Sequence, residues 1–228
     1  MRVGVRNIIV ALMVLAAAQS ARAQEGGGSR ANRANKSIMI ALQPIGFGPI
    51  PSLTNALIVG YFLEPDLVLQ LEVANGFRIN YTAVEAGKDE NGSGTSSSST
   101  GWEVEYKANS AGLYAKYFVG NSFYVKGGVD YRNVVQKDIY YTTLSQRAYE
   151  FNGNALALAF AFGNQFQFSY FTLGFDIAGY VVPVSNSVTE TFPAGATAYG
   201  ERRSRDAQDA YLKQPSAILG RFYLGASF

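Results

Sequence analysis

The stretch LVLQLEVANGFRINY, from Leu67 to Tyr81, alternates apolar and polar or small residues almost without interruption. Successive side chains of a β-strand point to opposite faces, so this period of two predicts a strand. One face carries the large apolar side chains, namely Leu67, Leu69, Leu71, Val73, Phe77 and Ile79. The opposite face carries Gln70, Glu72, Ala74, Gly76, Arg78 and Asn80. The first face therefore suits lipid, and the second does not.

The same pattern recurs along the chain in segments of about ten residues that are separated by turn residues, which is typical of a transmembrane β-barrel. We count eight segments: residues 37–47, 55–63, 67–81, 102–119, 122–135, 154–162, 169–182 and 214–228. Within the fourth segment, the alternation that marks the outward face shifts by one residue between Ala108 and Ala111, which predicts a β-bulge. Gly163-Asn164 is predicted to begin the turn after the sixth.

The connections between these segments alternate in length. They are short after the second, fourth and sixth segments, and long at residues 82–101, 136–149 and 184–213. Short periplasmic turns and long outer loops are the rule for outer-membrane barrels. The sequence therefore predicts an all-β fold: an eight-stranded antiparallel transmembrane barrel with up-and-down meander topology over residues 37–228.

The last segment is patterned up to Phe228. Its apolar face is predicted to hold Ile218, Phe222, Leu224, Ala226 and Phe228, and the other face Leu219, Arg221, Tyr223, Gly225 and Ser227. In pattern, loop alternation and this ending, the chain resembles the eight-stranded outer-membrane barrels of the OmpA and OmpX type. The resemblance implies that Phe222, Leu224 and Phe228 belong to an assembly signal that the barrel-assembly machinery reads, with periplasmic chaperones as earlier partners. It also gives the expectation of a barrel without a peptidoglycan-binding domain.

The N-terminal segment has the three parts of a secretory signal peptide over residues 1–23. Arg2 and Arg6 precede the apolar run 8–18, and Ala21-Arg22-Ala23 is an A-x-A cleavage site. The apolar run is too short for a membrane anchor. Residues 24–36 have no apolar pattern, so we expect a disordered periplasmic leader.

Composition excludes several classes of protein. Without the three arginines of the signal, 16 basic and 17 acidic side chains remain, a formal net charge of −1. Such a chain has no electrostatic reason to bind nucleic acid. Cysteine is absent, so there is no disulfide. A soluble lipocalin-like barrel is the main rival fold, because alternation alone does not say which face is inward. Charges gathered on one face and aromatic residues at strand ends favour the outer membrane.

Any chemistry would lie on the inward face or in the outer loops. The predicted lumen residues are Gln43, Gln70, Glu72, Arg78, Lys126, Asp130, Arg132, Asp176 and Arg221, with Tyr124, Tyr180 and Tyr223. Eight strands enclose a space that side chains can fill, and buried charges need partners. We therefore expect a salt-bridged lumen. A narrow porin-like channel for ions or small solutes is the alternative, because inward Ala155, Ala157, Ala159 and Ala161 leave room.

Catalysis is not expected, because the chain has neither histidine nor cysteine. The tightest polar cluster, Glu103, Glu105 and Lys107, suits a solvated strand extension better than an active site. In the last outer loop, Arg202, Arg203 and Arg205 are candidates for binding a polyanion such as the phosphates of lipopolysaccharide, unless nearby acidic residues neutralise them. The expected protein is a monomeric surface or structural barrel in the outer membrane, without cofactor or metal.

Overall fold

The computed structural model describes residues 28–48, 53–76, 79–84, 101–141, 146–196, 201–202, 205–206, 209 and 212–228. The predicted signal peptide and the first residues of the leader lie outside these ranges. The elements are α2 (Ser29–Arg33), β1 (Ile38–Phe47), β2 (Leu53–Glu64), β3 (Leu67–Gly76), β4 (Ile79–Val84), β5 (Gly101–Phe118), β6 (Phe123–Tyr141), β7 (Gln146–Phe168), β8 (Phe171–Thr191) and β9 (Ser216–Ser227).

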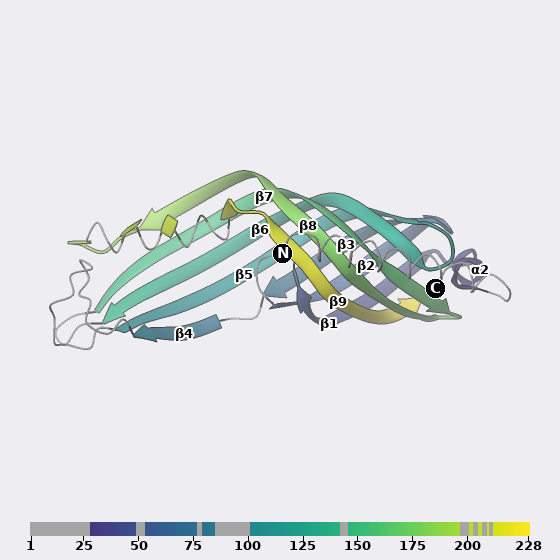
Figure 1. Cartoon of the computed structure of the whole chain (residues 1–228), viewed down its shortest axis with the longest axis horizontal. Coiled ribbons are helices and arrows are strands. Elements are labelled where there is room, and N and C mark those ends of the chain that lie inside the picture. The colour runs from purple at the N-terminus through teal and green to yellow at the C-terminus, as the bar shows by residue number, and fades with distance from the viewer. Residues whose placement is uncertain are drawn as a thin grey trace, which may run out of the picture.

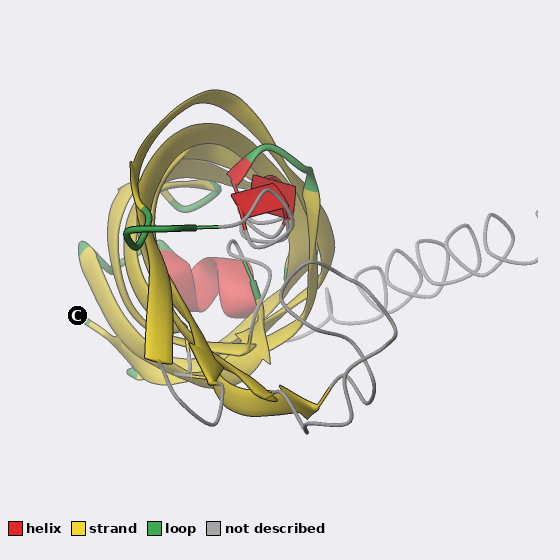
Figure 2. Ribbon diagram, turned by 90° about the vertical axis from the view of Figure 1, so that its left-hand side faces the viewer, coloured by secondary structure: helices red, strands yellow, loops and turns green. Residues whose placement is uncertain are grey.

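These strands form one closed, antiparallel ring. Each strand pairs with its neighbours in sequence, and β1 closes the ring by pairing with β9. β3 and β4 both pair with β5, at Asn109–Tyr117 and Gly101–Tyr106, so they are successive parts of one barrel strand. The ring therefore has the eight strands that the sequence predicts, and the predicted third strand 67–81 is divided between β3 and β4. Figure 2 shows the ring end-on.

The two ends of the barrel differ. Short connections, Pro65-Asp66, residues 119–122 and Ser169-Tyr170, lie at one end with the C-terminus. At the other end β4, β5, β6, β7 and β8 run far past the rest of the ring (Figure 1). This asymmetry confirms the predicted topology, with short turns on the periplasmic side and long extensions outside.

The outward face decides between the membrane barrel and its soluble rival. Large apolar side chains are exposed on every strand of the ring, among them Leu71 at 48%, Phe160 at 53% and Leu224 at 42%. In a soluble barrel these side chains would point into the lumen, and a belt of this extent in water would be a severe aggregation liability. The belt therefore faces lipid. Among the described residues, no helix is long and apolar enough to span a membrane.

Several strands are longer than the pattern predicts. β6 ends at Tyr141 and β7 begins at Gln146, so most of the predicted loop 136–149 is strand. β8 likewise continues to Thr191, and Gly163-Asn164 lies within β7 instead of starting a turn. Beyond the membrane the outward residues are mostly polar, so the lipid-facing alternation fades although backbone pairing continues. The pattern therefore marks the part of a strand in lipid and misses the rest.

The predicted bulge in the fourth strand is wrong. β5 pairs with β6 in unbroken register from Gly101–Tyr141 to Phe118–Tyr124. Register shifts instead occur in β8, where Ile177 is the extra residue opposite β7, and in β9 opposite β1 around Gly220. Gly220 has a φ of +57°, a left-handed conformation that glycine adopts without strain.

These two irregularities reverse the faces that simple alternation assigns. Tyr180, predicted inside, is 53% exposed on the lipid side. Ile218, predicted on the lipid face, is fully buried, and Leu219, predicted inside, is 49% exposed. Asp176 and Arg221, on the periplasmic side of the shifts, remain buried in the lumen.

Candidate functional site: the closed lumen

The centre of the lumen holds a ring of four buried charges that come from four strands. Arg221 on β9 forms ion pairs with Glu72 on β3 and, at 3.3 Å, with Asp176 on β8. Lys126 on β6 contacts Asp176 at 2.8 Å and Glu72 at 3.6 Å. Each side chain is 1% exposed. The signs alternate around the ring, and its contacts cross the bore of the barrel, because β3 and β9 are not neighbouring strands.

Neutral polar groups complete the shell around these charges. Arg221 Nε donates to Gln43 Oε1 at 2.6 Å, and Gln70 Nε2 donates to Glu72 Oε2 at 3.3 Å. Tyr124 donates its hydroxyl to Asp176. Gly46 on β1 leaves room for the Arg221 stem, since a Cβ at that position would lie 2.6 Å from Arg221 Cγ. Buried charges need such hydrogen bonds as well as ion pairs, and this ring has both.

Lys116, which was not among the predicted lumen residues, is a third buried cation beside the two cations of the ring. Its Nζ lies 3.2 Å from Gln165 Oε1 and 3.1 Å from the Tyr223 hydroxyl. Its Nζ also lies 4.4 Å from the centre of the Tyr124 ring, within reach of a cation–π interaction. Alternation along β5 is a signal that could have found it, because Leu113 and Tyr117 face outward and Lys116 lies on the opposite face.

Further out, the lumen is less completely paired. Tyr114 donates to Asp130 Oδ2 at 2.7 Å, and Arg132 NH2 donates to Ser216 Oγ at 3.0 Å. Among the described residues, Asp130 Oδ1, Ser110 Oγ, and the Nε and NH1 atoms of Arg132 are buried and have no hydrogen-bond partner. Ala155 and Ala157 are inward and fully buried on β7, as predicted. The structure thus brings together all the predicted lumen charges except Arg78, which lies outside the described residues.

Apolar clusters lie on either side of these polar layers. The periplasmic cluster includes Phe62, Val68, Phe118 and Tyr223. The outer cluster consists of Tyr106, Ala108, Val134, Phe151 and Ala155, with Leu212 from the last outer loop. Leu212 is fully buried and packs against Gly153, where a Cβ would clash with it. A segment of the outer loop therefore reaches into the mouth of the barrel.

The periplasmic mouth is covered by α2, so the described part of the predicted disordered leader, residues 28–36, is folded against the barrel. The fully buried Arg33 donates to the carbonyl oxygens of Pro65 at 2.8 Å and Asn121 at 2.7 Å. Its guanidinium lies 3.7 Å from the centre of the Phe118 ring. Burial lowers the pKa of Arg33 to about 10. Figure 2 shows α2 as the fainter red helix inside the ring.

Further contacts with the periplasmic end of β7 and with the β2–β3 turn also hold α2 in place. Asn32 Nδ2 donates to the Gln167 carbonyl at 2.8 Å, and Ser29 Oγ accepts from the Gln167 N–H at 3.0 Å. Arg30 pairs with Asp66 at 2.7 Å, and this hydrogen bond raises the pKa of Arg30. Residues 29–33 have no apolar period that could reveal this helix, because polar contacts attach it.

The outer-loop arginines are partly neutralised. Arg205 contacts Glu190 Oε2 at 3.1 Å and Glu201 Oε2 at 3.4 Å, and the hydrogen bond to Glu190 raises its pKa. Glu201 is one of the nearby acidic residues of the loop, whereas Glu190 lies in the part of β8 beyond the predicted segment 169–182 and was not expected as a partner. Arg202 is exposed, and Arg203 lies outside the described residues.

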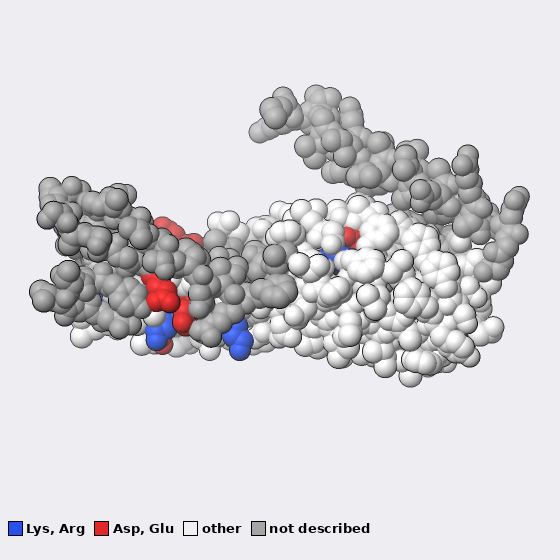
Figure 3. Space-filling view, turned by 90° about the horizontal axis from the view of Figure 1, so that it is seen from below, with Lys and Arg blue, Asp and Glu red and all other residues white. Residues whose placement is uncertain are grey.

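The one cluster considered for catalysis lies on the outward face of β5. Glu105 and Lys107 line a cleft of about 710 Å³ outside the lumen, and Glu103 is half-buried nearer the outer end. Within the described part of the chain, no group of three or more acidic or sulfur- or imidazole-bearing side chains could hold a metal ion. Figure 3 shows that charged side chains gather over the outer end, whereas the barrel body seen from this side is almost uncharged.

No protein-family model matches the chain, and no curated protein matches it. Among solved structures, a major outer membrane protein from Thermus thermophilus aligns with a TM-score of 0.50 and 15% identity, over 85% of this chain and 98% of that one. CarO2 and CarO of Acinetobacter baumannii each align over 85% of this chain, with TM-scores of 0.40 and 0.37 and identities of 12% and 14%. The two alignments cover 100% of the CarO2 chain and 97% of the CarO chain. Together with the lipid-facing belt, the first likeness shows that this chain has the fold of an eight-stranded antiparallel outer-membrane β-barrel.

Proposed function

We propose that this protein is a closed, non-conducting outer-membrane barrel with a structural or surface role. The observation that carries the proposal is the ring of Glu72, Arg221, Asp176 and Lys126, whose contacts cross the bore. An ion on this path would have to displace partners from charges that are fully removed from water. Breaking one buried ion pair costs about 3–5 kcal/mol, so the ring is a high barrier.

Two further barriers lie in series with the ring. α2 covers the periplasmic mouth, and Leu212 packs into the outer apolar cluster. Neither catalysis nor a cofactor is part of the proposal, since the chain has no histidine or cysteine. The surface role would be exerted by the long outer extensions, with Arg202 as an exposed cation.

Assembly by the barrel-assembly machinery is part of this proposal. Phe222, Leu224 and Phe228 are exposed on the lipid side of the barrel, at 38%, 42% and 59%. A row of apolar side chains on one face of the last strand suits recognition in an extended conformation.

Planar-bilayer recording of the refolded chain 24–228 tests the closed barrel. We expect no discrete openings from the wild-type protein, while heat-modifiable migration on gels shows that it has folded. The variant Arg221→Ala and a form that lacks residues 24–35 would be recorded alongside it. Regular single-channel steps from the folded wild-type protein would overturn the proposal.

A narrow channel is the second candidate, and the outer half of the lumen favours it. Ser110, Asp130 and Arg132 have buried polar atoms that find no partner in the part of the protein that the structure describes, beside the small side chains of Ala155 and Ala157. Such atoms require water. Openings that appear when residues 24–35 are removed, and that Arg132→Met alters, would support a channel closed by α2.

A further inference from the structure

Asparagine residues form a row around the outside of the barrel. Cross-strand pairing joins Asn55 to Asn75, Asn75 to Asn109, Asn109 to Asn133, and Asn133 to Asn154. The row thus crosses β2, β3, β5, β6 and β7 without a gap. All five residues are exposed or half-buried, on the same outward face as the lipid-facing belt.

The row follows directly on the edge of the apolar belt. Leu57, Val73, Tyr131 and Leu156, all exposed, each lie two residues from an asparagine of the row on the same strand. Since alternate residues of a strand share a face, each asparagine is the first outward polar side chain beyond lipid. The row is at the level where the headgroups of the outer leaflet begin.

Hydrogen bonds within the row leave donors on its surface. Asn133 Nδ2 donates to Asn152 Oδ1 at 3.0 Å and to Asn154 Oδ1 at 2.9 Å, and the Tyr131 hydroxyl donates to the same Asn154 oxygen at 2.8 Å. The carbonyl ends of Asn152 and Asn154 are thus occupied. Among the described residues, their Nδ2 groups have no protein acceptor. Free amide donors favour acceptor-rich ligands such as phosphates and sugar hydroxyls.

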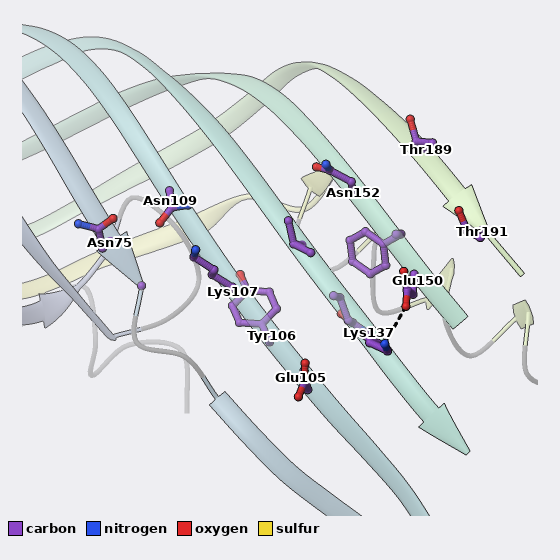
Figure 4. Close-up of a pocket in the computed structure, with 14 residues that line it drawn as sticks. Asn75, Glu105, Tyr106, Lys107, Asn109, Lys137, Glu150, Asn152, Thr189 and Thr191 are labelled. Atoms are coloured by element: carbon purple, nitrogen blue, oxygen red, sulfur yellow. Dashed lines mark ion pairs between the residues drawn. The ribbon is translucent and has the colours of Figure 1, made fainter. Parts of the chain in front are cut away.

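A cleft of about 710 Å³ opens beside this row on the outer extensions of the strands. Its lining includes the amides of Asn75, Asn109 and Asn152, the cations Lys107 and Lys137, and the carboxylates Glu105 and Glu150. Lys137 is paired with Glu150 at 2.9 Å, whereas Lys107 has no ion pair within the described part of the chain. Figure 4 shows the polar side chains of neighbouring strands around the cleft.

We propose that this cleft and the asparagine row bind the phosphorylated sugar headgroup of an outer-leaflet glycolipid. Lys107 would pair with a phosphate, and the amides of Asn109 and Asn152 would bind phosphate or sugar oxygens. The position of the cleft directly above the lipid belt lets the acyl chains of the same molecule lie against the exposed side chains of β5, β6 and β7. A free phosphate in water would contact only the cleft, whereas a glycolipid contacts both the cleft and the apolar belt. The occupant we propose is therefore the lipid.

Native mass spectrometry of the full mature chain in non-ionic detergent tests this proposal, with bisphosphorylated lipid A as the probe. Lys107→Gln combined with Asn152→Ala should weaken lipid A binding by about tenfold, since a charge-assisted hydrogen bond and a neutral one are lost. Lys213→Gln is the matched control, because Lys213 is equally exposed but pairs with Asp209 outside the cleft. Heat-modifiable migration checks that each variant folds.

Two further probes separate the chemistry of the headgroup from that of any anionic lipid. Dephosphorylated lipid A should bind the wild-type protein about as weakly as lipid A binds the double variant. Phosphatidylglycerol, which has a phosphate but no sugar, should bind both proteins equally. Unchanged lipid A binding in the double variant, the same loss in Lys213→Gln, or equal affinity of the wild-type protein for phosphatidylglycerol and lipid A would each overturn the proposal.

Discussion

The charge ring makes a quantitative prediction for the substitution Arg221→Met. Methionine keeps most of the length of the side chain but removes the ion pairs to Glu72 and Asp176 and the hydrogen bond to Gln43. Two buried carboxylates would then share one cation, Lys126. An uncompensated buried charge costs about 3–5 kcal/mol, so the free energy of unfolding should fall by about that amount.

Charge balance can be restored by a second substitution. Glu72→Gln alone leaves Arg221 and Lys126 facing one carboxylate, whereas Arg221→Met with Glu72→Gln leaves Asp176 paired with Lys126 at 2.8 Å. The loss of unfolding free energy in the double variant should therefore be about 1–3 kcal/mol smaller than the summed losses of the two single variants. This coupling energy separates lost electrostatics from lost packing.

The assay is urea unfolding in phospholipid vesicles, with the folded fraction measured from the heat-modifiable gel band. Arg205→Met is the control, because Arg205 pairs with Glu190 at an exposed position in the outer loop and its loss should leave the unfolding midpoint unchanged. Additive losses in the double variant, or an Arg221→Met midpoint equal to that of the control, would refute the view that the ring is an electrostatic unit.

The remaining predictions concern the two covers of the barrel, α2 at the periplasmic mouth and the Leu212 contact at the outer mouth. Arg33→Ala removes two hydrogen bonds to turn carbonyls, so protease should cut near residues 29–34 faster than in the wild-type protein. Lys36→Ala is the control and should not have this effect. Equal cleavage rates in the two variants would show that Arg33 does not hold α2 in place. Leu212→Ala leaves a cavity in the outer cluster and should destabilise the docked loop by about 2–5 kcal/mol, measured as faster hydrogen exchange there. An unchanged rate of hydrogen exchange in the loop would mean that Leu212 does not stabilise its docked position.

Strand alternation predicted most of the barrel because lipid imposes it. The eight-stranded ring, the order of turns and the inward position of Glu72, Lys126 and Asp130 all follow from a period of two. That period fails where one extra residue enters a strand, as at Ile177 and around Gly220. Nothing in the side chains around Ile177 marks a bulge, so Tyr180 and Ile218 were placed on the wrong faces.

The covers could not be predicted, because they depend on contacts distant in sequence. Arg33 binds the carbonyls of two turns, and Leu212 is a single apolar residue in a polar loop. The asparagine row, in contrast, left a partial signal in the sequence. Asn75, Asn133 and Asn154 each stand two residues beyond an apolar side chain, but only strand register shows that they are neighbours.

The layered lumen also determines how a closed barrel should respond to mutation. α2, the charge ring and the Leu212 cluster lie one after another along the bore, and barriers in series add their resistance. Removing α2 exposes the ring to water without breaking it, and neutralising the ring leaves apolar mouths that resist hydration at both ends. Stability and conductance should therefore respond differently: one substitution in the ring suffices to destabilise the barrel, whereas a continuous aqueous path requires that all three layers be opened together.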